Sequence, residues 1–222
     1  MSPASTIARS ELILGGQKSG KSRRAELLAR QWLAESSAHH AVLIATGQAW
    51  DAEMAARIER HQKERAERVP GLLTVEEPHD LAGALARVSS PQALVVVDCL
   101  TLWLTNWLMP AAGTAAGGGR TATPVLPPLP LGEGGGEGRI FEEKPPVTTD
   151  WQAQAAHFFE VAKQAPGPVV LVGNEIGLGV IPLGREVRAF VDALGCLNQQ
   201  AAQACARVTL MVAGLPMTVK TA

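Results

Sequence analysis

One eight-residue segment near the start of the chain has the composition of a phosphate-binding loop. It fits the pattern Gly-x-x-x-x-Gly-Lys-[Ser/Thr] in full and reads Gly15-Gly16-Gln17-Lys18-Ser19-Gly20-Lys21-Ser22. The glycines allow the backbone to turn tightly, so that successive N–H groups face inward and hold an anion. We expect Lys21 to reach the β- and γ-phosphates of a nucleotide and the Ser22 hydroxyl to bind Mg²⁺. The alternative is a glycine-rich turn that precedes a helix by coincidence.

A carboxylate follows an apolar run in the middle of the chain. Asp98 comes directly after Leu94-Val95-Val96-Val97, which has the pattern of a buried strand. A carboxylate at the end of such a strand suits the Walker B role, in which it holds Mg²⁺ directly or through water. The alternative is an ordinary strand-end Asp that caps the helix expected from Thr101.

The best candidate for a nucleophile is a histidine in a predicted helix. This helix has Asp51 as its expected N-cap and carries Met54, Ile58 and His61 on one stripe. A histidine on such a stripe is more often structural than catalytic. The helix follows an apolar run at 41–45, however, and in a parallel sheet the loop between them lies at the same edge as the phosphate-binding loop. A neutral imidazole there could attack phosphorus and form a phosphoramidate.

Three arginines lie close to this histidine in the same predicted helix. Arg57, Arg60 and Arg65 could stabilise negative charge on phosphate oxygens, or they could be solvated surface residues. The sequence alone leaves both interpretations open.

These residues need a sheet to position them, and the apolar pattern predicts one. Runs of strand length at 11–14, 41–45, 72–75, 93–97, 169–173 and 208–212 alternate with helical segments at 21–33, 51–68, 79–88, 101–109, from 150 onward, and 185–206. This alternation predicts an α/β domain with a mostly parallel central sheet flanked by helices on both faces. With the phosphate-binding loop it predicts a P-loop NTPase fold, and the run at 217–220 adds a small C-terminal β element.

Residues 110–149 break the alternation. They are rich in Gly and Pro and poor in residues that could form a core, so they cannot bury enough apolar area to offset the entropy of ordering. We therefore predict a single domain over residues 1–222 with a flexible insertion at 110–149, for which a functional lid is the alternative.

Composition limits the function classes. The formal net charge of −1 gives no broad basic field, so we expect no nucleic-acid partner. No run approaches the roughly 20 apolar residues of a membrane span, and the first ten residues do not form a secretory signal. The three cysteines, Cys99, Cys196 and Cys205, lack metal-ligand spacing, which favours a reduced setting. Together these features predict a cytoplasmic enzyme.

Several short blocks occur in an order that is characteristic of one family. They are the phosphate-binding loop, Ala45-Thr46, Asp51-x-Glu53-Met54-x-x-Arg57-Ile58-x-x-His61, Thr74-Val75-Glu76-Glu77-Pro78, Asp98-Cys99-Leu100-Thr101 with Asn106, and Asn174-Glu175-Ile176-Gly177-x-Gly179-x-x-Pro182. In these blocks, over nearly the whole chain except the insertion, the sequence resembles the bifunctional adenosylcobinamide kinase / adenosylcobinamide-phosphate guanylyltransferase family of cobalamin biosynthesis.

The resemblance implies two reactions. The first phosphorylates adenosylcobinamide with ATP or GTP, and the second transfers GMP from GTP to adenosylcobinamide-phosphate, giving adenosylcobinamide-GDP. It implies that His61 carries the guanylyl group, with Lys21 assisting, and that Ser22 and Asp98 hold Mg²⁺. It also implies nucleotide contacts for the whole phosphate-binding loop and for Ala45, Thr46, Glu76 and Asp98.

The resemblance further suggests a homo-oligomer, with a trimer as the expected assembly, and a ligand-contacting loop that begins at Asn174. Three positions depart from the family pattern: Lys18 stands where Arg is more usual, Leu72 where a Trp is expected, and Cys196 where an Arg is expected. The competing interpretations are a simple P-loop kinase of a small metabolite, in which His61 is structural, and a nucleotide-sensing binding module.

Overall fold

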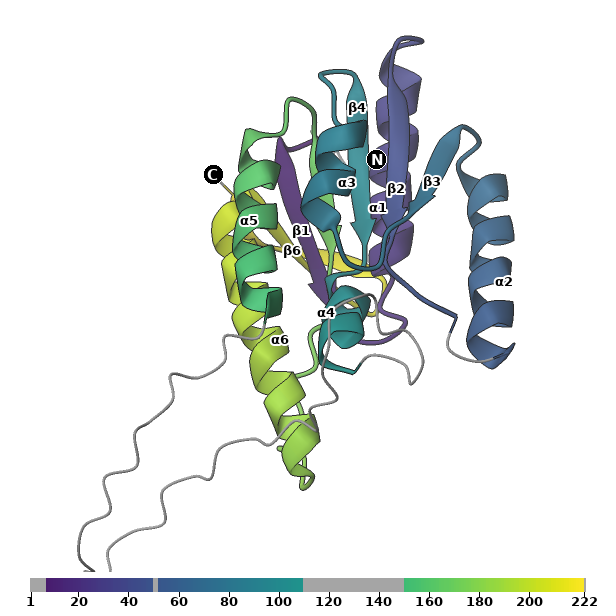
Figure 1. Ribbon diagram of the computed structural model, residues 1–222. Coiled ribbons are helices and arrows are strands. Elements are labelled where there is room, and N and C mark those ends of the chain that lie inside the picture. Colours follow the sequence, from purple (N-terminus) through teal and green to yellow (C-terminus); the bar gives the residue numbers. More distant parts are fainter. Residues whose placement is uncertain (1–6, 50–51, 110–149, 222) are drawn as a thin grey trace, which may run out of the picture.

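A seven-stranded sheet forms the centre of the computed structural model, which describes residues 7–49, 52–109 and 150–221 (Figure 1). The strand order is β3-β2-β4-β5-β1-β6-β7. All neighbouring pairs are parallel except β6 and β7, which pair antiparallel. The strands are β1 (Ser10–Gly15), β2 (His40–Ala45), β3 (Leu72–Glu76), β4 (Ala93–Asp98), β5 (Val169–Val172), β6 (Arg207–Val212) and β7 (Leu215–Thr221).

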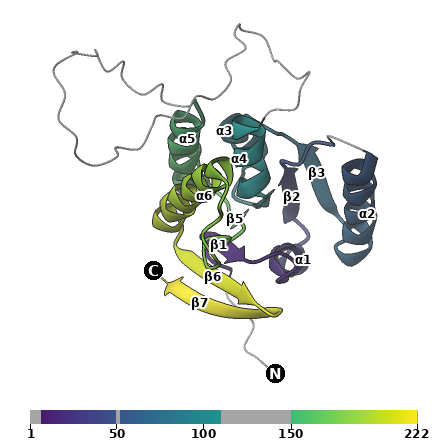
Figure 2. The same ribbon diagram turned by 90° about the horizontal axis from the view of Figure 1, so that it is seen from below.

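Helices cover both faces of this sheet. They are α1 (Lys21–Glu35), α2 (Ala52–Arg68), α3 (Leu81–Val88), α4 (Leu100–Leu108), α5 (Asp150–Gln164) and α6 (Arg185–Ala204). Figure 2 shows α3, α4, α5 and α6 on one side of the strands and α1 on the other. Helix α2 stands beside the β3 edge, apart from these layers (Figures 1 and 2).

The alternation of side chains along β4 explains why both faces must be covered. Val95 and Val97 belong to the core cluster under α3 to α6, whereas Leu94 and Val96 belong to the cluster under α1. Because successive side chains of a strand point to opposite faces, a strand that is apolar throughout needs a helix layer on each side. The predicted α/β class with a mostly parallel sheet is therefore confirmed.

Several element boundaries differ from the predicted ones for local reasons. The helix predicted from 79 begins at Leu81, because the Asp80 side chain accepts a hydrogen bond from the Gly83 N–H (2.8 Å) and caps it. The helix predicted to reach 206 ends at Ala204, and Cys205 is already extended before β6.

The C-terminal β element is longer than predicted. Strand β7 covers Leu215–Thr221 rather than 217–220, because Ala213 and Gly214 take positive φ angles of 50° and 82° and make a tight hairpin from β6. The expected N-cap, Asp51, and the predicted insertion at 110–149 lie outside the described residues.

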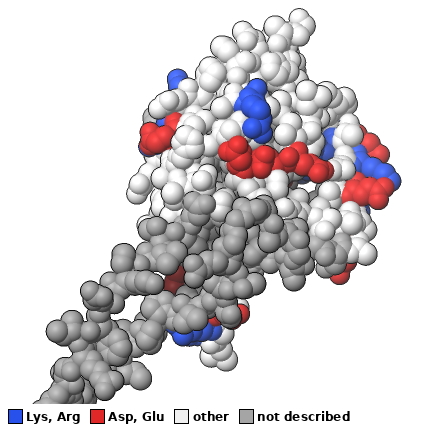
Figure 3. Space-filling view, in the orientation of Figure 1, with Lys and Arg blue, Asp and Glu red and all other residues white. Residues whose placement is uncertain are grey.

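The distribution of charged side chains on the visible surface agrees with the formal net charge of −1. Figure 3 shows one face, on which acidic and basic side chains stand in small mixed groups without a broad field of one sign. Among the described residues, no helix is both long enough and apolar enough to cross a membrane.

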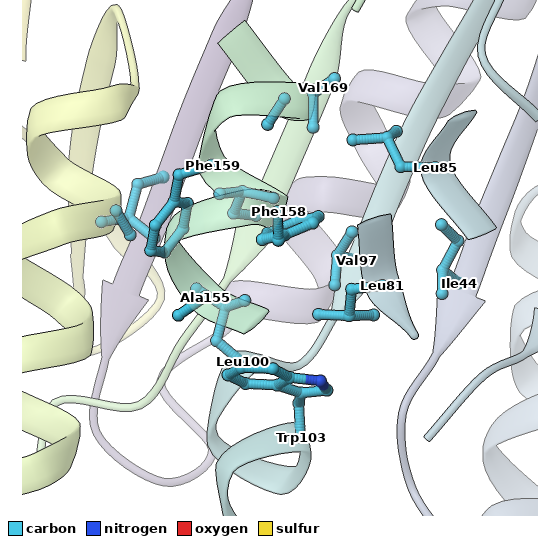
Figure 4. Packing of buried hydrophobic residues seen from close by; sticks show 14 of the residues in the cluster. Ile44, Leu81, Leu85, Val97, Leu100, Trp103, Ala155, Phe158, Phe159 and Val169 are labelled. Carbon is cyan, nitrogen blue, oxygen red and sulfur yellow. The ribbon is translucent and has the colours of Figure 1, made fainter. Parts of the chain in front are cut away.

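The packing of the core under α3 to α6 predicts how single substitutions change the free energy of unfolding. Leu85 of α3 is fully buried in the same cluster as Val97 and Phe158 (Figure 4), whereas Leu183 is 97% exposed. We expect Leu85→Ala to lower the free energy of unfolding by about 2–5 kcal/mol, because it leaves a cavity. The matched control Leu183→Ala should change it by less than about 0.5 kcal/mol. Urea unfolding measures both, and equal effects of the two variants would contradict the described packing.

Candidate nucleotide-binding site

A cavity of about 920 Å³ opens at the carboxyl ends of the parallel strands. One side is the loop between β1 and α1, and the other is α2. This edge of an open α/β sheet is where ligands bind. Of the residues predicted to contact nucleotide or to act in catalysis, the cavity is lined by Gln17, Lys18, Ser19, Gly20, Lys21, Ser22, Ala45, His61, Glu76 and Asp98.

The loop between β1 and α1 needs glycine at two positions. Gly15 has a φ of 153°, and a Cβ there would lie 2.6 Å from the Met211 carbonyl oxygen. Gly20, the N-cap of α1, is left-handed with a φ of 99°. Neither conformation suits a residue with a side chain. The loop thus leads the chain from β1 into the N-terminus of α1, where free N–H groups and the helix dipole favour an anion.

Lys21 is a buried cation at the start of α1. Its side-chain ammonium donates a hydrogen bond to the Gly16 carbonyl (2.7 Å), and only 8% of the residue is exposed. Burial lowers the pKa of Lys21 below its ordinary value, while the nearby Cys99 and Asp98 act in the opposite direction. A cation that has lost much of its water has a strong preference for an anionic partner, as a phosphate would supply.

Ser22 and Asp98 meet at the same point. The Ser22 hydroxyl hydrogen-bonds to the Asp98 carboxylate. Desolvation raises the pKa of Asp98, and the hydrogen bond from Ser22 together with the charges of Arg65 and Lys21 opposes this rise. A hydroxyl and a carboxylate are hard oxygen ligands of the kind that Mg²⁺ takes when nucleotide phosphates and water complete its coordination.

Two further observations bear on the role of Asp98. The described residues contain no cluster of three or more His, Cys, Asp or Glu side chains that would hold a metal without help from a substrate. The alternative role, as a helix cap, is wrong, because the N-cap of α4 is Cys99 and no side chain caps that helix.

Thr46 lies beneath the cavity instead of lining it. The residue is fully buried, and its hydroxyl both donates to the Cys99 carbonyl (2.7 Å) and accepts from the Cys99 N–H (2.9 Å). The Asn106 amide in turn donates to the Thr46 carbonyl (2.8 Å). Thr46 therefore holds the chain that follows Asp98.

Helix α2 supplies the opposite wall of the cavity and carries His61. The His61 side chain is exposed and lines the cavity together with Arg60 and Arg65. The side chain of Arg57 lies outside the described part of the structure. The predicted stripe of α2, with Met54, Ile58 and His61, thus lines the same cavity as the phosphate-binding loop and stands on the opposite side of it.

A buried carboxylate that the sequence reasoning missed joins α2 to α1. Glu26 is 5% exposed and makes a two-point ion pair with Arg68 (2.7 and 3.1 Å). Because Glu26 lies four residues after Ser22 in α1, the two side chains share one face of that helix, and this spacing was the available signal. A second, weaker link joins Gln62 of α2 to Glu76 at the end of β3 (3.3 Å).

The loop after β5 is also fixed against the phosphate-binding loop. The Glu175 N–H donates to the Gly15 carbonyl (3.0 Å), and the Asn174 N–H donates to the Thr101 hydroxyl (2.8 Å). Asn198 of α6 holds the Asn174 carbonyl (3.0 Å). Asn174 lines the cavity, as expected for the start of a ligand-contacting loop.

Comparison with known proteins adds independent findings. A family model described as cobinamide kinase / cobinamide phosphate guanyltransferase matches residues 11–219. A Pseudomonas aeruginosa protein named bifunctional adenosylcobalamin biosynthesis protein CobP is 39% identical over 210 residues, which cover 95% of this chain and 96% of that protein. The Escherichia coli protein named bifunctional adenosylcobalamin biosynthesis protein CobU is 32% identical and covers 94% of this chain and 98% of its own length.

The three cysteines should differ sharply in reactivity. Burial raises the pKa of the Cys99 and Cys205 thiols to about 12, whereas Cys196 is exposed. At pH 8 a thiol with a pKa of about 12 is roughly one part in 10,000 thiolate. We expect iodoacetamide to modify only Cys196 rapidly in the native protein and all three in denaturant, as followed by peptide mass spectrometry. Native Cys99 or Cys205 reacting as fast as Cys196 would show that the described burial is wrong.

Proposed function

The chain belongs to the cobinamide kinase / cobinamide phosphate guanyltransferase family, and on that basis we propose that it performs both reactions at one nucleotide site with His61 as the covalent carrier of GMP. It is an enzyme with kinase and nucleotidyltransferase activities. The acceptor of the first reaction is adenosylcobinamide, and the donor is ATP or GTP. The second reaction joins GMP from GTP to adenosylcobinamide-phosphate and gives adenosylcobinamide-GDP.

The observation that carries this proposal is the shared cavity. Lys21, Ser22 and Asp98 line one side, and His61 lines the other. A nucleoside triphosphate whose β- and γ-phosphates lie in the nest of loop N–H groups would direct its α-phosphate and nucleoside outward into the cavity. A single bound nucleotide can therefore meet both the loop and the histidine, and no second nucleotide site is needed.

Guanylyl transfer then takes two displacements at phosphorus. An imidazole nitrogen of His61 attacks the α-phosphorus, a P–N bond forms, and the bond to the bridging oxygen breaks, so that pyrophosphate leaves. A phosphate oxygen of adenosylcobinamide-phosphate next attacks the same phosphorus, the P–N bond breaks, and free His61 is regenerated. Lys21 and the loop N–H groups offset the charge that develops on the leaving pyrophosphate.

The kinase reaction uses the same loop for a different phosphorus atom. The aminopropanol hydroxyl oxygen of adenosylcobinamide attacks the γ-phosphorus, the bond to the β,γ-bridging oxygen breaks so that the nucleoside diphosphate leaves, and the hydroxyl proton passes to solvent. Catalysis of this kind consists largely of positioning and electrostatic stabilisation. Lys21 and the α1 N-terminus supply both, and His61 has no part in this step.

The residues that would hold Mg²⁺ are Ser22 and Asp98, which already contact each other. When bound, the ion would supply positive charge to the phosphate oxygens. Both residues contribute only oxygen atoms, so the site suits a hard cation. Ala45 and Glu76, which line the cavity beyond the loop, are proposed nucleotide contacts.

The proposed domain organisation rests on the apolar pattern and composition of the chain, and the proposed assembly rests on the family resemblance. We propose a single catalytic domain over residues 1–222, within which 110–149 is an insertion. The assembly that we propose is a homo-oligomer, and specifically a trimer.

The covalent intermediate makes the sharpest prediction. After exposure to GTP that carries a radiolabel on the α-phosphate, wild-type protein should retain acid-labile label after denaturation. His61→Ala should retain less than about 1% of this label, because removing a nucleophile eliminates the intermediate. The matched control is His157→Ala, which removes an exposed histidine of α5 and should leave labelling unchanged.

Two results would oppose the proposal. Wild-type labelling in His61→Ala would remove His61 from the reaction. Phosphorylation of adenosylcobinamide by wild-type protein that never acquires label would favour the simple kinase, in which His61 is structural.

A further inference from the structure

The segment between β5 and α6 exposes a dense run of apolar side chains. Residues 176–184, the apolar loop, read Ile-Gly-Leu-Gly-Val-Ile-Pro-Leu-Gly and contain no polar side chain. The four most exposed large apolar side chains in the described part of the chain all belong to it: Leu178, Val180, Ile181 and Leu183. Val180 is 95% and Leu183 97% exposed. Single apolar side chains are normal on a surface, whereas a group of them indicates a binding surface.

Hydrogen bonds fix both ends of the apolar loop. Just before it, the Glu175 N–H donates to the Gly15 carbonyl of the phosphate-binding loop (3.0 Å). At its other end, the Arg188 guanidinium donates to the carbonyls of Pro182 (2.9 Å) and Leu183 (2.6 Å). The exposed apolar side chains are therefore carried by a segment that is anchored at the nucleotide site on one side and at α6 on the other.

The apolar loop adjoins the nucleotide cavity. Asn174, two residues before it, lines that cavity. Figure 1 shows that α6 extends past the carboxyl ends of the strands, which carries its N-terminal end and the segment before it beyond the sheet. Figure 2 shows α6 and α2 on opposite sides of the strand ends. The apolar loop thus borders the space in front of the strand ends on the side away from α2.

The size of the cavity leaves room for only one of the two substrates. Its volume of about 920 Å³ lies near the upper end of the roughly 300–1,000 Å³ that one drug-sized ligand takes. In the proposed function, the nucleoside triphosphate fills this space. Adenosylcobinamide is larger than a drug-sized ligand, because a corrin macrocycle carries an adenosyl group and several amide side chains. Only its aminopropanol arm has to enter the cavity, so the macrocycle needs a surface beside it.

The side chains of the two surfaces agree with this division. Charged residues such as Lys21, Arg60 and Asp98 line the cavity, whereas the apolar loop has none. The edge of a corrin macrocycle carries methyl groups and the methylene stems of its amide side chains. Burial of such surface against exposed Leu, Ile and Val side chains is favourable, because both leave water.

We infer that the apolar loop is the acceptor-binding surface. The corrin macrocycle of adenosylcobinamide, or of adenosylcobinamide-phosphate, lies against it while the aminopropanol arm extends past Asn174 into the cavity. The inference rests on the proposed function, from which it takes the acceptor, and it adds the part of the chain that recognises a corrinoid. Binding energy from this remote contact places the hydroxyl or phosphate beside the reacting phosphorus.

The test is a double variant, Val180→Ser with Leu183→Ser, in which the two substrates are measured separately. With saturating GTP, the KM for adenosylcobinamide should rise about 10- to 100-fold, because two apolar contacts with the macrocycle are lost. Acid-labile label from α-labelled GTP, measured without acceptor, should stay within about 2-fold of wild type, since the nucleotide does not touch the apolar loop. The urea midpoint should not change, because both side chains are almost fully exposed.

Two controls separate recognition from simpler explanations. Val219→Ser removes a 62% exposed apolar side chain from the edge strand β7, at a position that does not line the cavity, and should leave the KM for adenosylcobinamide within about 2-fold. Val180→Met with Leu183→Met changes the shape of the apolar loop but keeps it apolar. This variant should stay within about 3-fold of the wild-type KM.

The outcomes are distinguishable. An unchanged KM for adenosylcobinamide in the double serine variant, an equal rise in Val219→Ser, or an equal loss of covalent label overturns the inference and leaves the proposed function standing. Sedimentation velocity tests the other occupant: if the double serine variant dissociates an oligomer that wild type forms, the apolar loop binds a second copy of the chain and the inference is wrong. A wild-type chain that neither acquires label nor phosphorylates adenosylcobinamide overturns the proposed function, and this inference with it.

Discussion

A triphosphate that binds at the edge of the sheet needs positive charge beside its phosphate oxygens. The core on both faces of the sheet is mostly apolar, so the positive groups that neutralise phosphate come from the segments at its carboxyl edge. Lys21 does this from within the protein, where burial lowers its pKa and strengthens its preference for an anion. Thr46 and Asn106 support the arrangement from below by holding the chain next to Asp98. These buried hydrogen bonds thus fix the backbone that carries Asp98 at the cavity.

In the proposed mechanism, helix α2 is the part of the molecule that makes the second reaction possible, because it carries His61. It stands beside the sheet and not on it (Figure 2), and its links to the body include the polar pairs of Arg68 with Glu26 and of Gln62 with Glu76. Such pairs position an element without burying it in the core. A phosphate-binding loop alone suffices for a kinase, whereas the proposed nucleophile on the facing wall would allow the α-phosphorus to be attacked as well. The same cavity can then serve two phosphorus atoms of one kind of substrate.

Local sequence patterns predicted most of this structure because the features are themselves local. The phosphate-binding loop, the apolar run before Asp98 and the helix that carries His61 each lie within a short stretch, and the alternation of runs predicted the parallel sheet. The pairings between distant segments could not be predicted. Nothing in the sequence indicated that the fold would place Cys99 against the Thr46 hydroxyl. Glu26 looked like an ordinary helix residue until α2 brought Arg68 to it.

The central claim is that GMP passes through a covalent adduct on His61, and the configuration at phosphorus tests it most directly. The measurement uses GTP made chiral by sulfur at the α-phosphorus and determines the configuration of the transferred group in the adenosylcobinamide product. Two successive in-line displacements predict net retention. Net inversion would mean a single direct displacement by adenosylcobinamide-phosphate, and it would contradict the account even if His61 were essential for activity.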